Sequence, residues 1–96
     1  MVRVISKRAI TEFVRRHPNA KPGLDQWYEV TRRAQWLTLA DVKQVYPHAD
    51  LVGRRTVFNI SGNHFRLIAR INYRVQAVFV LFILTHFEYD QGAWKR

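Results

Sequence analysis

Apolar residues in the first part of the chain recur at intervals of three and four, with charged residues between them. This period predicts an amphipathic helix that begins after Ser6, a suitable capping residue, and ends at His17, since the residue before Pro18 avoids the helical backbone conformation. A short apolar stretch, Val2–Ile5, predicts a strand ahead of the helix. The helix positions expected to face the core are Ala9, Ile10, Phe13 and Val14.

Two further helices are predicted before residue 50. After a loop over Asn19–Gly23, a stripe of apolar and small residues at helical spacing predicts a second helix. Thr38 and Asp41 form a variant capping box, which begins a short third helix that Pro47 ends. The positions expected to face inward are Leu24, Trp27, Thr31 and Ala34 in the second helix, and Leu39, Val42 and Val45 in the third.

The pattern changes to alternation from about Arg54 onward. Gly62-Asn63 is a two-residue turn signal, and placing it at the centre of a hairpin gives one apolar face and one mostly polar face along both strands. Because a shift by one residue would exchange the faces, this agreement supports the register independently. The opposed pairs are Ile60 with Phe65, Phe58 with Leu67, Thr56 with Ala69, Asn59 with Arg66, and Arg55 with Arg70.

An uninterrupted apolar run, Ala77–Leu84, follows a predicted turn at Tyr73–Gln76. It predicts a central strand that is covered on both faces, whose register the pattern does not define. The chain as a whole therefore predicts an α+β fold, with two to three N-terminal helices packed on one face of a small, largely antiparallel β-sheet. We expect residues 1–96 to form a single domain, because no linker, repeat or low-complexity segment interrupts them.

Composition narrows the classes of function. The chain has 16 Lys and Arg residues against 7 Asp and Glu, a formal net charge of +9, and so basic a chain is attracted to polyanions such as nucleic acids. It has no cysteine, which excludes disulfides and thiolate sites and is typical of a cytoplasmic protein. The longest apolar run is too short to cross a membrane, and the first residues lack the apolar segment of a signal peptide.

The polar face of the predicted hairpin carries three arginines, which would repel one another in the absence of an anion. A phosphate backbone is their natural partner, although polar residues also belong on any solvated face of an antiparallel sheet. The polar residues on this face or near its turn are Arg55, Asn59, Ser61, His64, Arg66 and Arg70.

Titratable side chains are dense just after the long apolar strand. Histidine is the side chain best suited to act as an acid or a base in proteins, so His86 could do either. Tyr89 could stack on a base, and Asp90 could orient a histidine. The alternative is a pair of half-buried amphipathic residues, His86 and Tyr89, with Glu88 and Asp90 as surface carboxylates, and spacing alone favours that interpretation slightly for the two carboxylates. The histidines are scattered without the spacing of a metal pair, so we expect no metal site.

Two separated segments together resemble the HigB-type toxins. Val57–Arg66 matches the family pattern V-F-N-x-x-G-N-x-x-R, and Thr85–Asp90 matches T-H-x-E-Y-D. The resemblance implies a RelE-like fold and an endoribonuclease that cleaves mRNA in the ribosomal A site during translation. It also implies a type II toxin–antitoxin system with a cognate HigA-type antitoxin that carries a helix-turn-helix domain.

The family pattern places Arg66 and His86 on its motif positions, with Asn59, Asn63 and Tyr89 beside them. We therefore expect catalysis by a chemistry that needs no metal or cofactor. Two alternatives stay open: a basic module that binds RNA or DNA without cleaving it, and an interaction protein whose basic face serves an acidic partner. The expected catalytic residues are His86, Arg66 and Tyr89, and the expected RNA-binding residues are Arg55, Asn59, Asn63, His64 and Arg70, of which His64 and Arg70 rest on the face pattern alone.

Overall fold

The computed structural model describes residues 1–95. Its elements, in chain order, are β1 (Arg3–Ile5), α1 (Lys7–Arg16), the short 3₁₀ helix η1 (Pro18–Ala20), α2 (Lys21–Arg32), α3 (Leu39–Val45), β2 (Asp50–Val52), β3 (Arg55–Ile60), β4 (Phe65–Asn72), β5 (Ala77–Thr85), α4 (His86–Gln91) and the 3₁₀ helix η2 (Ala93–Lys95). The strands form one sheet in the order β1-β5-β4-β3-β2. Only the β1–β5 pair among them is parallel, so the predicted α+β architecture with a largely antiparallel sheet is confirmed.

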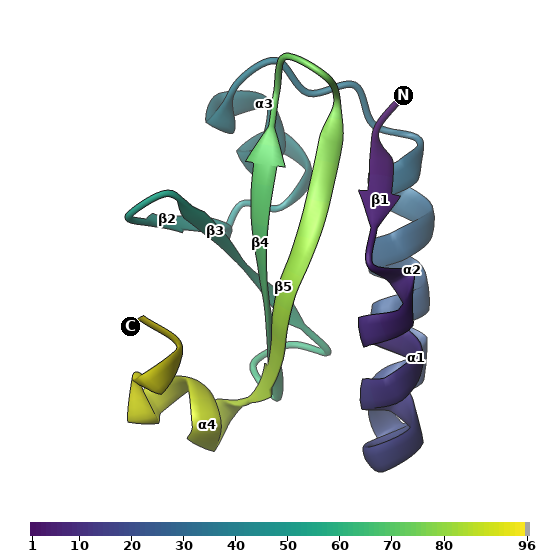
Figure 1. The fold of residues 1–96 in the computed structure, drawn as a ribbon, viewed down its shortest axis with the longest axis vertical. Coiled ribbons are helices and arrows are strands. Elements are labelled where there is room, and N and C mark those ends of the chain that lie inside the picture. The colour runs from purple at the N-terminus through teal and green to yellow at the C-terminus, as the bar shows by residue number, and fades with distance from the viewer. Residues whose placement is uncertain (96) are drawn as a thin grey trace.

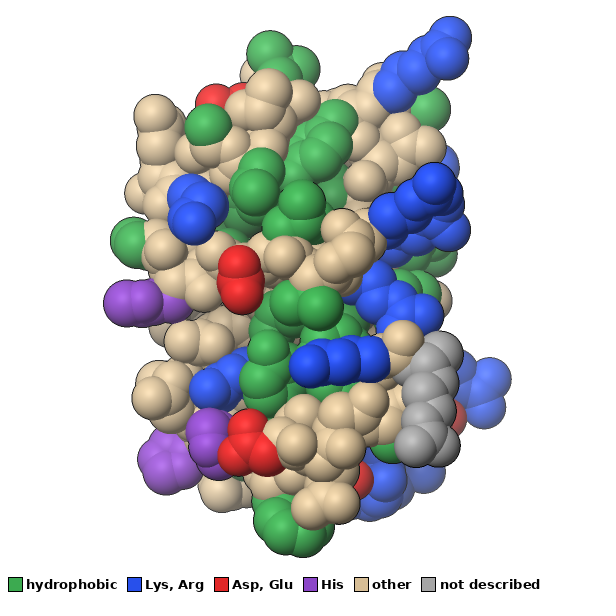
Figure 2. Space-filling view, turned by 90° about the vertical axis from the view of Figure 1, so that its left-hand side faces the viewer, with side chains coloured by type: hydrophobic (Ala, Val, Ile, Leu, Met, Phe, Trp, Pro, Cys, Tyr) green, Lys and Arg blue, Asp and Glu red, His purple; other side chains and the backbone are tan. Residues whose placement is uncertain are grey.

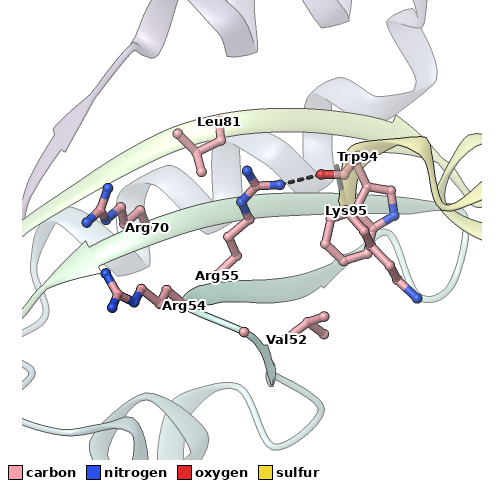
Figure 3. A pocket seen from close by; sticks show the side chains of 8 residues that line it. Val52, Arg54, Arg55, Arg70, Leu81, Trp94 and Lys95 are labelled. Carbon is pink, nitrogen blue, oxygen red and sulfur yellow. Dashed lines mark hydrogen bonds between the residues drawn. The ribbon is translucent and has the colours of Figure 1, made fainter.

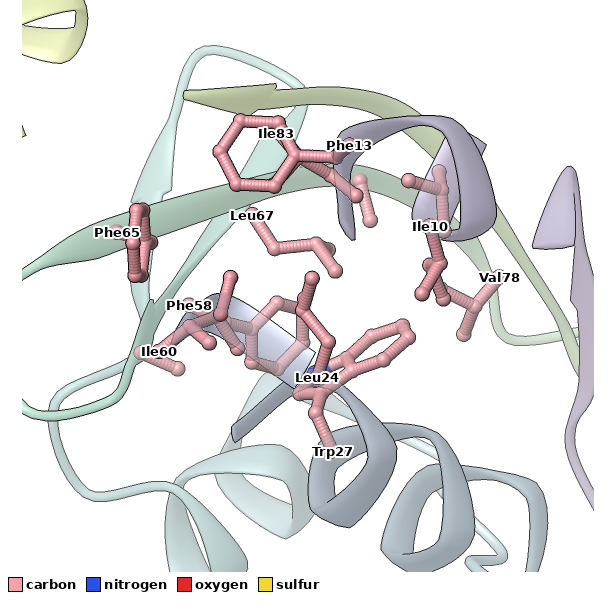
Figure 4. Packing of buried hydrophobic residues seen from close by; sticks show 14 of the residues in the cluster. Ile10, Phe13, Leu24, Trp27, Phe58, Ile60, Phe65, Leu67, Val78 and Ile83 are labelled. Atoms are coloured by element: carbon pink, nitrogen blue, oxygen red, sulfur yellow. The ribbon is translucent and has the colours of Figure 1, made fainter. Parts of the chain in front are cut away.

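Helices α1 and α2 lie together on one side of the sheet, whereas α4 and η2 lie on the other side (Figure 1). The core fills the space between the sheet and the first two helices, where Phe13, Trp27, Phe58 and Leu67 are almost fully buried (Figure 4). Ring contacts order this core, since Trp27 packs edge-on against Phe58 with centroids 5.4 Å apart. We call the sheet face that carries α4 and η2 the outer face.

The strand and helix predicted at the start of the chain are confirmed, with His17 at the end of α1. Ser6 occupies the capping position, but its side chain accepts no capping hydrogen bond and its backbone is left-handed, with φ of 76°. The tight turn between β1 and α1 demands this conformation, so the expected cap does not form.

The predicted loop over Asn19–Gly23 is wrong, because η1 and the first turn of α2 occupy it. Pro22 fits in that first turn, where a backbone N–H has no helical partner. Gly23 allows α2 to approach the β3–β4 turn closely: a Cβ atom built there would lie 2.4 Å from Ser61 Oγ and 2.9 Å from Ile60 Cγ2. The glycine therefore serves helix packing and is not part of a loop.

The capping box that begins α3 is confirmed by the reciprocal hydrogen bonds of Thr38 and Asp41. Val45 was expected to face inward but is 46% exposed. Tyr46, one residue later, takes the inner position instead, with its ring 5.2 Å from that of Phe58. In the preceding helix Leu24, Trp27 and Thr31 are buried as expected, whereas Ala34 lies beyond its last residue.

The β3–β4 register is confirmed, including Asn59 opposite Arg66. The prediction that the Ala77–Leu84 run forms a strand covered on both faces is only partly right. The strand exists, but β4 is the middle strand, and Leu81 and Phe82 are 38% and 37% exposed. A bulge explains the exposure, because Ala69 pairs with Val80 while Ile68 pairs with Phe82, which leaves Leu81 unpaired between them.

The outer face is less polar than the alternation predicts. Val57 and Ile68 form a second apolar cluster there, and Trp94 from η2 covers them. This small cluster fixes the end of the described chain on the sheet and so places α4 beside β4. Within residues 1–95, no helix is both long enough and apolar enough to span a membrane.

Candidate functional site

Arg66 is the buried cation of the outer face, with only 8% of the residue exposed. Its guanidinium donates to the backbone oxygens of Asn63, at 3.0 Å, and Phe65, at 3.3 Å. Among the residues that the structure describes, no carboxylate lies within salt-bridge distance of it. Because a buried charge normally requires a partner, this arrangement is suited to binding an anion.

Helix α4 supplies the titratable groups. Thr85 and Glu88 form a capping box that fixes its start, so the structural interpretation of Glu88 holds. His86 is the first helical residue, half exposed, and its Nε2 lies 3.1 Å from Oδ2 of Asp90. Residues three and four apart share one side of a helix, so Tyr89 lies on the same side as this pair. The contact between His86 and Asp90 allows the carboxylate to orient the imidazole, a role that the spacing alone did not favour.

Strand β4 and helix α4 meet where the guanidinium of Arg66 lies over the ring of Tyr89, 5.2 Å from its centroid. The backbone N–H of His86 donates to the carbonyl oxygen of His64 at 3.0 Å, which ties the helix to the hairpin turn. Figure 2 shows imidazole, carboxylate and basic side chains gathered at the lower left of the outer face. Arg66 and Tyr89 are therefore in contact on the outer face, and His86 lies one helical turn from Tyr89 on the same helix.

The hairpin turn adds two amides to this group. Asn63 Oδ1 accepts weak hydrogen bonds from Asn59 Nδ2, at 3.4 Å, and from a guanidinium nitrogen of Arg66, at 3.5 Å. Both asparagines also line a shallow cleft with His48 and Gly62. Asn59 and Asn63 thus lie beside Arg66, and His64 is joined to α4 through its backbone oxygen.

Arg55 and Arg70 do not belong to this group. They line a separate cleft with Arg54, Leu81, Trp94 and Lys95 (Figure 3). Arg55 donates to the backbone oxygen of Trp94, and Trp94 stacks on Tyr89 with ring centroids 5.1 Å apart. The three arginines expected on this face are thus divided into two groups by the apolar cluster beneath Trp94.

Sequence reasoning missed Arg54 and Lys95 as candidates for this surface. Arg54 precedes the alternating strand and Lys95 lies in the tail, so neither falls on the polar positions of the hairpin. The one available signal was Trp94, a large aromatic residue within a polar tail, which indicates that the tail packs on the domain.

Burial and hydrogen bonding displace the pKa values of Tyr46, Tyr73, Glu29 and Arg32. Burial raises the pKa of Tyr46, against a smaller opposite effect of its hydrogen bond with Thr31, and burial likewise raises the pKa of Tyr73. On α2, a hydrogen bond with Arg32 lowers the pKa of Glu29 and raises that of Arg32. Within residues 1–95, no three His, Cys, Asp or Glu side chains are grouped as metal ligands would be.

Around Arg66 the chain thus combines a group that can transfer protons with a buried cation and an aromatic ring. An imidazole held by a carboxylate can accept or donate a proton. A guanidinium beside it can stabilise negative charge that develops on a bound phosphate. This combination suits the transfer of a phosphoryl group between oxygen atoms.

Comparison with known proteins gives one consistent result. An mRNA interferase HigB of Escherichia coli O6:H1 is 32% identical over 91 residues, which cover 92% of this chain and 88% of the relative. The mRNA interferase toxin HigB of Escherichia coli K12 is 24% identical over 90 residues, covering 91% and 86%, and the same values hold for that of Shigella flexneri. Residues 20–92 match the family described as the RelE-like toxic component of a toxin–antitoxin system. The chain therefore belongs to the HigB toxin family.

Proposed function

We propose that this protein is an endoribonuclease that cleaves mRNA. The observation that carries the proposal is the buried guanidinium of Arg66, which lacks a carboxylate partner among residues 1–95 and lies against the helix that bears His86 and Asp90. A phosphate diester supplies the missing negative charge, and RNA brings its own nucleophile. The relatives are themselves named mRNA interferases.

In the proposed reaction, the ribose 2′-oxygen attacks the adjacent phosphorus and the bond to the 5′-oxygen breaks. A proton leaves the 2′-hydroxyl and a proton joins the departing 5′-oxygen, which yields a 2′,3′-cyclic phosphate and a 5′-hydroxyl. His86 carries out one of these proton transfers, and Asp90 orients its ring through the 3.1 Å contact. No metal or other cofactor takes part in this scheme.

Arg66 stabilises the charge on the pentacoordinate phosphorus, because its planar donors match phosphate oxygens. Tyr89, which packs beneath that guanidinium, keeps it in place and offers a ring edge or hydroxyl to the nucleotide. Asn59, Asn63 and His64 at the hairpin turn and Arg55 and Arg70 farther along the sheet contribute to RNA binding. Single-stranded RNA is the form whose bases such side chains can reach.

The substrate is proposed to be mRNA in the ribosomal A site, and the site of action is therefore the cytoplasm. The inhibitor is proposed to be a HigA-type antitoxin with a helix-turn-helix domain, encoded with the toxin as a type II system. Both expectations follow from the family, whose members are toxic components of toxin–antitoxin systems.

The test is induction of the protein without an antitoxin, followed by mapping of new mRNA 5′ ends. We expect growth arrest and new 5′-hydroxyl ends, both lost in His86→Ala and Arg66→Ala. Incubation of purified protein with mRNA, with and without ribosomes and with a chelator, then tests dependence on the ribosome and on metal. Growth arrest without new ends would contradict the proposal in favour of a module that binds RNA without cleaving it.

A further inference from the structure

The cleft of about 510 Å³ on the outer face is basic on several sides (Figure 3). Arg54 lies in the turn between β2 and β3, Arg70 lies on β4, and Lys95 comes from η2. The remaining lining residues are Val52, Gly53, Arg55, Leu81 and Trp94. None of these described residues is acidic, so the cations meet across the cleft without a carboxylate to neutralise them.

Arg55 differs from the other cations of the cleft. Its guanidinium donates to the Trp94 backbone oxygen and lies 5.5 Å from the centroid of the Phe82 ring. Trp94 is itself fixed, since its Nε1 donates to the Tyr89 carbonyl oxygen at 3.0 Å. Arg55 therefore contributes to RNA binding by holding η2, and hence Lys95, at the edge of the cleft.

The cleft is connected to the proposed cleavage site by a row of stacked groups. Trp94 at the cleft stacks on Tyr89, and Tyr89 lies beneath Arg66. Along β4, Arg66 and Arg70 point to the same face, and four residues of strand separate them by about 13 Å. This distance is short enough for a single strand of RNA with one phosphate at Arg66 to place another phosphate in the cleft, a few nucleotides away.

We propose that this cleft is a second phosphate-binding subsite, formed by Arg54, Arg70 and Lys95, for a nucleotide of the bound RNA that is remote from the cleaved bond. The inference rests on the proposed function. Proteins bind the backbone of single-stranded nucleic acid in positively charged grooves, and Arg54, Arg70 and Lys95 give the cleft this character. RNA is favoured over an acidic protein segment because the cleft shares its face and its aromatic stack with Arg66.

The test measures the binding of 2′-O-methyl RNA, which cannot be cleaved, to the full chain by fluorescence anisotropy over a range of salt concentrations. The variant is Arg54→Ala/Lys95→Ala, which leaves the contact between Arg55 and Trp94 in place. The matched control is Arg8→Ala/Arg15→Ala, which removes the same charge from the exposed side of α1. Thermal denaturation establishes that each variant is folded.

We expect the cleft variant to bind a long RNA at least about tenfold more weakly, since each charge-assisted contact to phosphate contributes substantially. Two lost contacts also reduce the slope of log K against log salt by about 1.4. The control should change neither quantity to this extent. The difference in RNA affinity between wild type and the cleft variant should decrease when the RNA is shortened from one end and not from the other, because the cleft lies to one side of Arg66.

The outcomes distinguish the two proposals. If wild-type protein neither binds RNA nor cleaves it, with or without ribosomes, both are overturned. If wild-type protein cleaves RNA and the cleft variant binds like the control, only the second subsite is overturned. Unchanged RNA binding together with weaker capture of the variant by the cognate antitoxin would assign the cleft to an acidic protein and would also overturn the inference.

Discussion

The guanidinium of Arg66 lies 5.2 Å from the centre of the Tyr89 ring, so a residue of β4 and a residue of α4 are in contact on the outer face. The contact joins the two segments that carry the family motifs. The same ring also stacks on Trp94. Tyr89 is therefore held by its neighbours, and a change in it affects both a cation and the packing of the tail.

Replacing Tyr89 by Leu should lower RNA cleavage more than replacing it by Phe. Phe keeps the ring beneath Arg66 and against Trp94, whereas Leu removes a cation–π contact of about 0.5–2 kcal/mol and the aromatic stack. Single-turnover cleavage of a short RNA measures the difference. Equal loss in both variants would show that the hydroxyl, and not the ring, is the group that matters.

Arg66→Met should strongly lower the cleavage rate without destabilising the protein. Methionine fills a similar volume and relieves the burial of a charge with no carboxylate partner among residues 1–95, while the charge that binds phosphate is lost. We expect the cleavage rate to fall on the order of 10²–10³-fold and the free energy of unfolding to stay equal or rise. Urea denaturation measures the latter. A decrease of more than about 2 kcal/mol would mean that Arg66 is mainly a structural residue.

His86→Ala should lower the cleavage rate on the order of 10²–10⁴-fold, the range expected for loss of a general acid or base. Asp90→Asn should lower it less, because the imidazole remains but its orientation is less fixed. Asp25→Asn, which removes an exposed carboxylate paired with Lys21 on α2, is the matched control. Wild-type rates in both His86→Ala and Asp90→Asn would contradict the proposed mechanism.

Gly23→Ala should destabilise the protein by about 1–3 kcal/mol, the typical cost of overpacking. The sign is diagnostic, because glycine to alanine within a helix otherwise stabilises by about 1 kcal/mol. Here the added methyl group meets Ser61 Oγ at 2.4 Å. Adding Ser61→Ala should restore part of the loss, with Ser61→Ala alone as reference. A stabilised Gly23→Ala protein would show that α2 and the hairpin turn are farther apart.

Tyr46 should make the protein less stable in alkaline solution. Burial raises the pKa of its phenol above the ordinary value of about 10, so the folded state retains the proton that the unfolded state loses. This contribution is complete below about pH 10 and is lost as the pH rises toward the folded-state pKa. Urea denaturation from neutral pH upward should show a shallower alkaline decline in Tyr46→Phe. That variant should also lose about 1 kcal/mol at neutral pH, since the hydroxyl donates to the Trp27 backbone oxygen. Parallel pH curves for the two proteins would contradict this assignment.

The hairpin could be predicted from sequence because two independent signals agree there. The turn residues Gly62-Asn63 fix the register, and the alternation of apolar residues fixes the face, so Asn59 was placed opposite Arg66 correctly. Helix α4 was not predicted as a helix, although Thr85 and Glu88 have the spacing of its capping box. A helix of six residues carries too few apolar positions for a period to show.

The sequence could not show which segments cover the outer face of the sheet. Alternation predicts that Arg66 points away from the core, and it does, but no pattern shows that Tyr89 from a later helix then covers it. Likewise, the continuous apolar run in β5 conceals a bulge, because every position is compatible with burial. These features arise from contacts between distant segments, which local periodicity does not record.

The pairing of β1 with β5 affects the order of folding and the behaviour of a shortened chain. Arg3 lies beside Ala77, so the loop closed by this contact contains all of the helical layer and most of the sheet. Contacts between such distant positions lose much chain entropy and form slowly, whereas β3 and β4 meet through a short turn. A chain without its first five residues would retain the hairpin and α4 but would leave one edge of β5 open. Such an edge is a template for pairing with another molecule, so truncation at this end would promote aggregation before it affected the residues around Arg66.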